Sequence, residues 1–335
     1  DEWFENELLR SAVSTAGIHH LSFGPFAAAT GYNLLHQHLY SKGVFHNGQT
    51  VNGGTVNLAN ALKTSAEFHH VEVQTNSKVT SIDTDNSICT GVTLYNGKSV
   101  KAKTVVSGLD PQNTFINLVG APSLNPNFHT QLRNIKYRGS AARIHFALEC
   151  LPEINGVSAD QMGTVFSICP TIEYLERASD AVKYGRLAEK PYVEFNIPTV
   201  TNPDFAPAGK HVLSATVQYA PYHLRGQKWD DELKSLLKKN VVGVLEKTIP
   251  GFSSLVESSI VVSPLDLENE FGLTEGNLNH GEMTLDQFMF MRPTISSAQY
   301  KSPIENLYLC GPGTHPGGGL HGANGSNAAK EILKG

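Results

Sequence analysis

Six glycines crowd into twelve residues near the C-terminal end of the chain. These glycines are Gly311, Gly313, Gly317, Gly318, Gly319 and Gly322. Glycine allows a backbone to approach a flat or anionic ligand closely, and the free N–H groups in a helix's first turn offer that ligand partial positive charge. The alternative interpretation is a tight turn that only packs the following helix. The density of glycines favours ligand binding.

Histidines are the second group able to do chemistry, and the chain has 14 of them. None belongs to an H-E-x-x-H motif, and close pairs such as His36 and His38 are more typical of structural or surface positions. We therefore predict no metal site. His315 and His321 flank the glycine loop, so either ring could donate a proton to a bound group or satisfy the loop backbone. Both interpretations stay open.

The four cysteines, Cys89, Cys150, Cys169 and Cys310, are far apart and include no C-x-x-C pair. They predict neither a zinc site nor a dithiol redox pair, and they fit a reducing compartment. Cys310 follows an apolar run with no obvious base nearby, which favours a packed thiol over a nucleophile. The residues around Ser326 lack the G-x-S-x-G spacing of a serine hydrolase.

The glycine loop needs a strand before it and a helix after it. Residues 307–309 form a short apolar run, and 324–335 have the small residues and spacing of a helix. A second apolar run at 105–107 leads into small residues before Pro111, where a strand would deliver its carboxyl end to a ligand. The two runs are therefore expected to position one site.

The region before this second run combines helix and strand patterns. Apolar spacing predicts a helix over 55–68, and alternation over 71–85 predicts one or two strands. The dipeptide Asn96-Gly97 between two alternating runs predicts a hairpin turn. We place a domain boundary near residue 110.

The chain between 111 and 300 has a different organisation. Strand-like runs separated by long polar, proline-rich connections predict an antiparallel sheet. These runs are 142–150, 163–169, 192–198 and 211–221. A long helix is predicted over 229–249, with Asp230 near its N-cap and one apolar face. That face comprises Leu233, Leu236, Leu237, Val241, Val244 and Leu245.

Composition limits the classes of protein to consider. A length of 335 residues predicts about two domains, and 40% apolar with 17% charged residues is typical of a folded, lightly charged protein. The net charge of -5 gives no attraction to nucleic acid or anionic membranes, so we predict no nucleic-acid partner. No apolar run approaches the roughly 18 residues of a transmembrane helix, so none is predicted. The element order predicts an α/β plus α+β fold.

Several segments carry a family resemblance. The stretch NLYLCGPGTHPGGGLHGANGSNAA resembles the C-terminal flavin motif of the phytoene desaturase-like FAD-dependent oxidoreductases, closest to their animal mitochondrial branch. The segments GGTVNLANAL, TNSKVTSI, VVSGLDPQNTF and GNLNHGEMTLDQFMFMRP resemble the same family in the same order. The resemblance covers nearly the whole chain. It implies FAD as the cofactor and a mitochondrial location.

The resemblance also implies a division of the fold. A partial FAD-binding domain of the glutathione-reductase-like kind would comprise 51–110 and 300–335. A substrate domain made of an antiparallel sheet and helices would be interposed, comprising 1–50 and 111–299.

By motif position, the resemblance implies cofactor contacts at both loops. The implied cofactor-binding residues are Val79, Ser107, Gly108, Gly311, Gly318, Gly319 and Leu320. Val79 would contact the adenine through its backbone, and 107–110 would lie near the adenosine-to-pyrophosphate region. Gly311 would reach the ribityl chain or phosphates, and 318–320 would lie under the isoalloxazine ring. His280 and Arg292 would face the flavin or its pocket, and with His315 they are the candidate catalytic residues.

The sequence departs from the family pattern at its start and at one turn. Family members begin with a strand and a G-x-G-x-x-G turn that binds the FAD pyrophosphate, and this chain has neither. We expect it to be the C-terminal part, about two thirds, of such a protein. Each lost charge-assisted phosphate contact would cost about 1.5–3 kcal/mol, so FAD binding by this chain is expected to be weak or absent. His70 also stands where the family usually has glycine.

Two functions follow from these observations. The first is the C-terminal portion or subunit of an FAD-dependent oxidoreductase that passes hydride from an apolar substrate to the flavin. A second polypeptide or an N-terminal segment would then complete the FAD domain. The second is a catalytically silent structural or assembly subunit of a large mitochondrial complex. The glycine loop favours the first, and the lacking G-x-G-x-x-G segment favours the second.

Overall fold

The computed structural model describes residues 3–38 and 51–334, and contacts group the chain into two units. The first unit comprises Asp1–Val73 and Ser140–Leu265, and the second comprises Gln74–Gly139 and Asp266–Gly335. Each unit has its own apolar core. The mixture of helices and sheets confirms the broad fold class predicted from the sequence.

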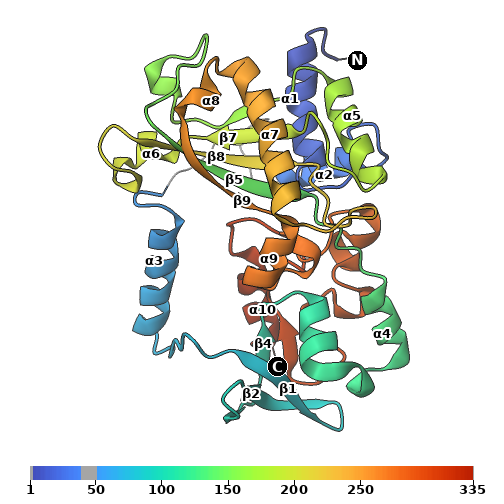
Figure 1. The fold of residues 1–335 in the computed structure, drawn as a ribbon. Helices are drawn as coiled ribbons and strands as arrows, with labels where there is room; N and C mark the ends of the chain where they lie inside the picture. The colour runs from blue at the N-terminus through green and yellow to red at the C-terminus, as the bar shows by residue number, and fades with distance from the viewer. Residues whose placement is uncertain (1–2, 39–50, 335) are drawn as a thin grey trace. The chain divides into compact units, whose positions relative to one another are not determined.

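A five-stranded antiparallel sheet forms the centre of the first unit, in the order β6-β7-β8-β5-β9 (Figure 1). Its strands are β5 (Ala141–Leu148), β6 (Phe166–Ile168), β7 (Tyr192–Asn196), β8 (His211–Gln218) and β9 (Val256–Val262). Four of them confirm the predicted runs. The edge strand β9 was not predicted, because its sequence VESSIVV leaves most side chains partly exposed and lacks a regular alternation.

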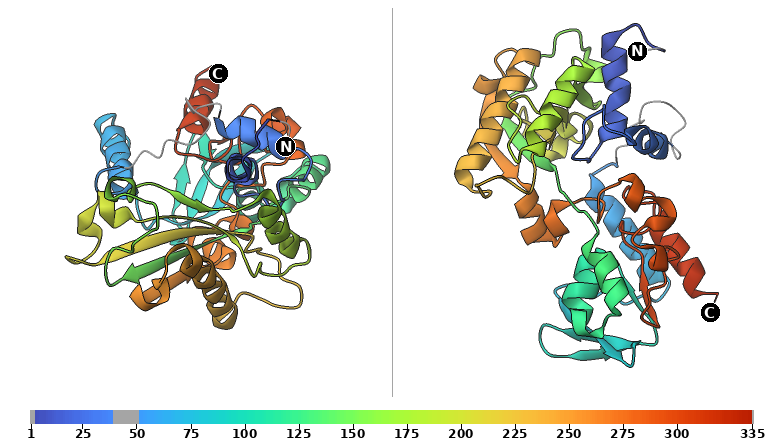
Figure 2. Two further views of the ribbon diagram at one scale, coloured as in Figure 1. Left: turned by 90° about the horizontal axis from the view of Figure 1, so that it is seen from above. Right: turned by 90° about the vertical axis from the view of Figure 1, so that its right-hand side faces the viewer.

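The first unit also contains seven helices within the described residues. They are α1 (Glu7–Ile18), α2 (Thr30–His38), α3 (Thr55–Phe68), α5 (Ile172–Lys183), α6 (Pro198–Thr201), α7 (Asp231–Thr248) and α8 (Phe252–Leu255). The α7 helix covers one face of the sheet (Figures 1 and 2) and begins where predicted, because the Asp230 carboxylate accepts a hydrogen bond from Leu233 N at 2.9 Å. Its buried stripe differs from the prediction at Leu236, which is 45% exposed.

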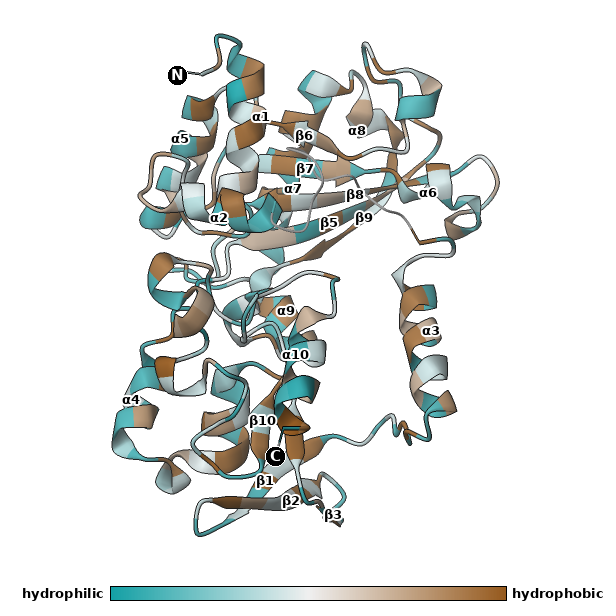
Figure 3. Ribbon diagram, turned by 180° about the vertical axis from the view of Figure 1, so that it is seen from behind, coloured by the Kyte–Doolittle hydropathy of each residue, from teal (hydrophilic) through white to brown (hydrophobic). Residues whose placement is uncertain are grey.

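The α3 helix confirms the prediction for 55–68, yet none of its residues is buried. Its apolar positions, brown in Figure 3, include the exposed Val56 and Leu62. Of the one or two strands predicted over 71–85, one forms over 79–85, and 71–78 contain no strand. His70 follows the helix in a left-handed conformation with φ of 64°. Histidine therefore takes the backbone conformation that glycine adopts more easily.

The second unit contains two small sheets. The antiparallel sheet joins β1 (Val79–Asp85), β2 (Ile88–Leu94) and β3 (Ser99–Lys101). Gly97, with φ of 81°, donates from its backbone N–H to Leu94 O at 2.9 Å, which confirms the predicted hairpin turn. The other sheet pairs β4 (Val105–Ser107) in parallel with β10 (Leu307–Leu309).

Helical segments complete the second unit. They are η1 (Gln112–Gly120), η2 (Ala121–Ser123), α4 (Pro126–Arg133), η5 (Thr274–Gly276), η6 (Leu285–Gln287), η7 (Met289–Met291), η8 (Ile295–Ser297) and α10 (Ala323–Ile332), while α9 (Pro264–Phe271) crosses from the first unit. The first unit has the short turns η3 (Ala159–Gln161) and η4 (Pro203–Phe205).

Among the described residues, no helix combines the length and apolar character that crossing a membrane requires.

The unit boundaries differ from the predicted domain ranges. Phe115, Phe128 and Leu132 pack in one core with Leu307 and Leu309, so 111–139 belong with the β4–β10 pair rather than with the middle sheet. Residues 51–73 group with the first unit, and 266–299 with the second. These groupings depend on contacts between distant segments. The assignment of the units to flavin and substrate roles stays a prediction.

Candidate functional site

Two parallel strands deliver the predicted loops to one edge of the second unit. Ser107 is in register with Leu309, so both strands end at the same level. Cys310 N donates to Ser107 O at 2.9 Å and extends the pairing into the loops. A Cβ atom on Gly311 would collide with Gly108 O, so glycine is required where the two loops touch. The structure therefore brings together two of the predicted segments.

The loop after β4 has its polar side chains engaged within the fold. Ser107 Oγ lies 2.7 Å from Thr114 Oγ1 and accepts a hydrogen bond from Leu109 N at 3.2 Å. The buried Asp110 carboxylate accepts from Asn113 N at 2.9 Å and from Thr274 Oγ1 at 2.9 Å. These bonds fix the path of the backbone. Any ligand contact at 107–109 would fall mainly to that backbone.

The glycine loop has a packed half and an open half. A Cβ atom on Gly318 would collide with Asn279 Oδ1, and one on Gly317 would lie 2.9 Å from the Met283 side chain. Gly322, in contrast, has no other heavy atom within 4 Å of a built Cβ. Leu320 is 84% exposed. Packing therefore explains the first glycines, whereas the residues next to α10 leave room for a ligand.

Asn324, in the first turn of α10, holds the loop in place. Its buried Nδ2 group lies 3.2 Å from Gly311 O and 3.0 Å from Thr314 O, and donates to both carbonyls. His321 also contacts the loop backbone, because its Nδ1 accepts from Ala323 N at 3.1 Å and its Nε2 lies 3.3 Å from Gly318 O. For His321 the structure thus favours the interpretation in which the ring satisfies the loop backbone.

Arg292 lies beneath the same loop and is 2% exposed. Its guanidinium donates to backbone carbonyls on both sides, at 3.1 Å to Pro312 and 3.0 Å to Gly281, and it also contacts Asn279 O. Burial lowers the pKa of Arg292 to about 10, so the group stays charged near neutral pH. These contacts favour a positioning role over the predicted place facing the flavin.

His280 is the predicted side chain whose position best suits a direct role. It has φ of 55°, and its Nδ1 is buried without a hydrogen-bond partner. A Cβ atom on Gly311 would lie 3.2 Å from that nitrogen. Burial, with a smaller effect of the Arg292 charge, lowers the pKa of His280 to about 4, although Asp110 opposes the shift. The ring is therefore neutral at pH 7 and can offer a hydrogen bond but no positive charge.

Two of the remaining predicted residues, His315 and Gly319, lie in the glycine loop, and the third, Val79, lies on β1. His315 is half-buried, its carbonyl accepts from Tyr300 Oη at 2.7 Å, and burial, aided by Arg292, lowers the pKa of its ring. Gly319 has φ of 127°, which favours glycine. Val79 begins β1 in register with Leu94. Their ligand contacts stay predictions.

Sequence reasoning missed Asn324, which donates hydrogen bonds to the glycine loop, and Asn279, whose side chain packs against Gly318. Asparagine has a low helix propensity, so its presence in the first turn of a small-residue helix was the one available signal for Asn324. Asn279 sits in an irregular segment whose path depends on Arg292 and Asn277, and no local pattern indicated it.

The first turn of α10 has the features expected of a site for one edge of a flavin ring. The first turn of α10 has free space beside Gly322 and Gly325, and its N-cap residue has no side chain to block approach. A helix N-terminus stabilises negative charge, as on the N1 and C2 carbonyl edge of reduced flavin. The exposed Leu320 supplies apolar surface next to it.

Comparisons with known proteins identify the family of the chain. Residues 19–333 match the family described as flavin containing amine oxidoreductase. The chain is 33% identical to pyridine nucleotide-disulfide oxidoreductase domain-containing protein 2 of Rattus norvegicus, covering 100% of this chain and 59% of that protein. It is 27% identical to a lycopene-forming phytoene desaturase of a Paracoccus species, covering 98% of this chain and 62% of the relative.

Solved structures with low sequence identity share the fold. An oxidoreductase from Methanosarcina mazei superimposes with a TM-score of 0.63 at 17% identity, covering 100% of this chain and 65% of that one. Cyclohexylamine oxidase from Brevibacterium oxydans gives a TM-score of 0.54 at 14% identity, covering 99% and 66%. The chain thus spans about three fifths of the length of its curated relatives.

Proposed function

The chain belongs to the flavin-containing amine oxidoreductases, whose cofactor is FAD, and on this basis we propose that it is the C-terminal portion or a subunit of an FAD-dependent oxidoreductase. The reaction we propose is hydride transfer from a C–H or N–H bond of an apolar substrate. The observation that carries the proposal is the open first turn of α10 at the end of a glycine loop.

The cofactor, when bound, supplies the acceptor for the hydride. The residues of this chain would bind and orient it. The backbone at 107–109 and at Gly311 would contact its extended part, and the first turn of α10 would stabilise negative charge on the ring. Asn324 and Arg292 would hold the loop rigid. The neutral His280 ring would offer a hydrogen bond.

The parallel sheet of the second unit has an unpaired edge at β4 among the described residues. Within the part of the chain that the structure describes, β4 pairs in a strand ladder with β10 alone, and Val106 is 43% exposed. Parallel sheets are normally covered on both faces and extend over more than two strands. We therefore expect another segment or a second polypeptide to pair with β4 and complete the FAD domain. A mitochondrial location rests on the family resemblance.

Titration with FAD tests the proposal. We expect purified chain to perturb the visible spectrum of added FAD and to quench its fluorescence saturably, with low affinity. The Gly318→Ala variant should lose this response, because the added methyl collides with Asn279 and shifts the loop. Gly243→Ala in α7 is the matched control, because no atom lies near its built Cβ.

An absence of any FAD response would contradict the proposal. A wild-type chain that leaves the FAD spectrum and fluorescence unchanged at all concentrations, while circular dichroism shows it folded, contradicts flavin binding by this chain. The structural or assembly role then becomes the better proposal. Migration as a lone small species in native separation of source material would in turn contradict that role.

A further inference from the structure

A groove of about 670 Å³ lies entirely within the first unit. Its apolar lining comes from α1, from the end of β6 and from α7. The apolar positions are Leu8, Ala12, Ile168, Pro170 and Val244. None of the predicted flavin-binding residues lines it. This volume falls in the range of small-molecule sites, roughly 300–1,000 Å³.

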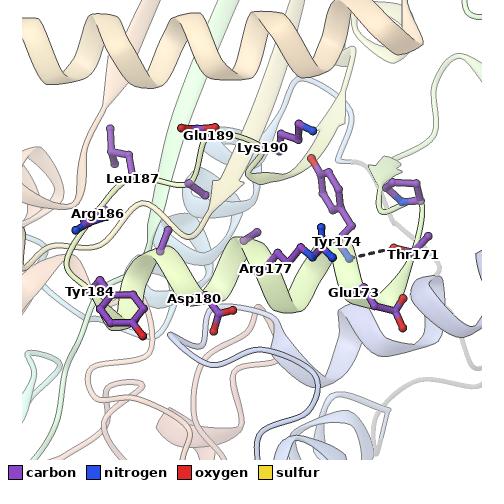
Figure 4. Close-up of a pocket in the computed structure, with 14 residues that line it drawn as sticks. Thr171, Glu173, Tyr174, Arg177, Asp180, Tyr184, Arg186, Leu187, Glu189 and Lys190 are labelled. Carbon is purple, nitrogen blue, oxygen red and sulfur yellow. Dashed lines mark hydrogen bonds between the residues drawn. The ribbon is translucent and has the colours of Figure 1, made fainter.

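A second hollow adjoins the groove over α5 (Figure 4). It has a volume of about 650 Å³ and shares Pro170, Tyr174 and Lys190 with the groove. Figure 4 shows Tyr174 and Lys190 on the same side of α5. Lys190 therefore lines both the groove and the adjoining hollow.

Hydrogen bonds hold the walls of the groove together. Ser11 Oγ of α1 donates to Cys169 O at 2.6 Å, and Ile172 N donates to Glu7 Oε1 at 3.0 Å. Tyr174 Oη donates to Pro191 O at 2.8 Å and fixes α5 to the segment carrying Lys190. Because these bonds join α1, the end of β6 and α5, the groove exists before any ligand enters, which lowers the entropy cost of binding.

The charges at the groove have one sign. Among the described residues, the charged side chains that line the groove are Lys190 and Lys247, whereas the acidic Glu173, Asp180 and Glu189 line the adjoining hollow. Neither lysine has an ion-pair partner among the described residues. An apolar groove with two unpaired ammonium groups is complementary to a molecule with an apolar tail and an anionic head.

We propose that this groove binds a fatty-acid-like carboxylate, with its alkyl chain against Leu8, Ala12 and Ile168 and its carboxylate at Lys190 and Lys247. The apolar walls bury the chain, and the two lysines provide charge-assisted hydrogen bonds to the head. The site is separate from the loops that the proposed flavin function uses, so the two proposals stand or fall independently.

Calorimetric titration of the full chain with decanoate tests this site. We expect saturable binding of one molecule per chain, with 1-decanol binding more weakly because it lacks the charge. Lys190→Gln and Lys247→Gln should each weaken decanoate binding by about threefold to tenfold. The double variant Lys238→Gln/Lys239→Gln changes two other exposed lysines of α7 and should leave binding unchanged. Ala12→Phe should fill the groove and weaken decanoate binding by about tenfold or more.

Three results would overturn the proposal. The first is an absence of saturable decanoate binding by folded chain. The second is equal affinity for decanoate and 1-decanol, or equal affinity in the lysine variants and the wild type. The third is self-association of the chain that Ala12→Phe abolishes, because the groove would then be covered by a second copy.

Discussion

Arg292 shows how one residue can stabilise an irregular site. It is buried and charged, and the recorded acceptors of its guanidinium are backbone carbonyls, including those of Gln287 at 3.2 Å and Pro312 at 3.1 Å. A planar guanidinium can reach several carbonyls at fixed angles, which a lysine ammonium cannot. The residue therefore joins the segment before it to the glycine loop.

Substitution of Arg292 by lysine tests this role. We expect Arg292→Lys to lower the free energy of unfolding by about 2–4 kcal/mol, because several buried carbonyls lose their donors while a buried charge remains. Urea denaturation followed by circular dichroism measures the change. Arg225→Lys at an exposed position is the control and should stay within about 0.5 kcal/mol of wild type. A loss of similar size in both variants would contradict the argument.

The lowered pKa of His280 predicts that the free energy of unfolding depends on pH. Its pKa is about 4 in the folded chain and 6.5 unperturbed, so the unfolded chain binds the proton more tightly. Stability contributed by the neutral ring is therefore present above about pH 6.5 and is lost as the pH falls toward about 4, by up to about 3 kcal/mol.

Denaturation at several pH values checks this contribution. His280→Asn keeps a residue that tolerates positive φ and should flatten the loss of unfolding free energy between pH 6.5 and 4. His69→Gln, at an exposed position, should retain the wild-type slope. If His280→Asn also keeps the full slope, another group causes the acid sensitivity.

At the level of elements, sequence patterns correctly predicted the helices and turns that local interactions stabilise. The α7 helix has a capping aspartate and a periodic apolar face, and the hairpin has Asn96-Gly97, so both were predicted correctly. The strand β9 was missed because its pairing with β5 supplies an order that its own sequence lacks. The glycine loop was located, yet its conformation depends on Asn279 and Arg292, which are distant in sequence.

Two neighbouring residues in the first turn of α10 should respond in opposite directions. Asn324→Ala removes the donor to Gly311 O and Thr314 O and should cost about 1–2 kcal/mol of unfolding free energy, net of alanine's better helix propensity. Gly325→Ala should gain about 0.5–1 kcal/mol, because its Cβ enters open space and alanine favours helix. Thermal and urea unfolding measure both. If both substitutions change the free energy of unfolding in the same direction and by the same amount, the contacts assigned to Asn324 and Gly325 are wrong.

At the level of the whole molecule, contacts between distant segments set the limits of prediction. The sequence change near residue 110 suggested a domain boundary, but the core containing Phe115 and Leu309 places 111–139 in the second unit. No local signal reports which distant segment a helix will pack against. The sequence predicts about two domains, and the ranges of the two units come from contacts that only the structure shows.

The separate cores predict that a core substitution weakens its own unit most. Leu237 packs in the first unit's core and Leu309 in the second's, and both are fully or almost fully buried. Leu237→Ala and Leu309→Ala should each cost about 2–5 kcal/mol through lost apolar contacts and a cavity. Hydrogen exchange with mass spectrometry should show protection lost mainly in 140–265 for the first variant and mainly in 74–139 and 266–334 for the second. Because each variant is the other's control, equal loss of protection across both units in either one would show that the chain unfolds as a single cooperative body.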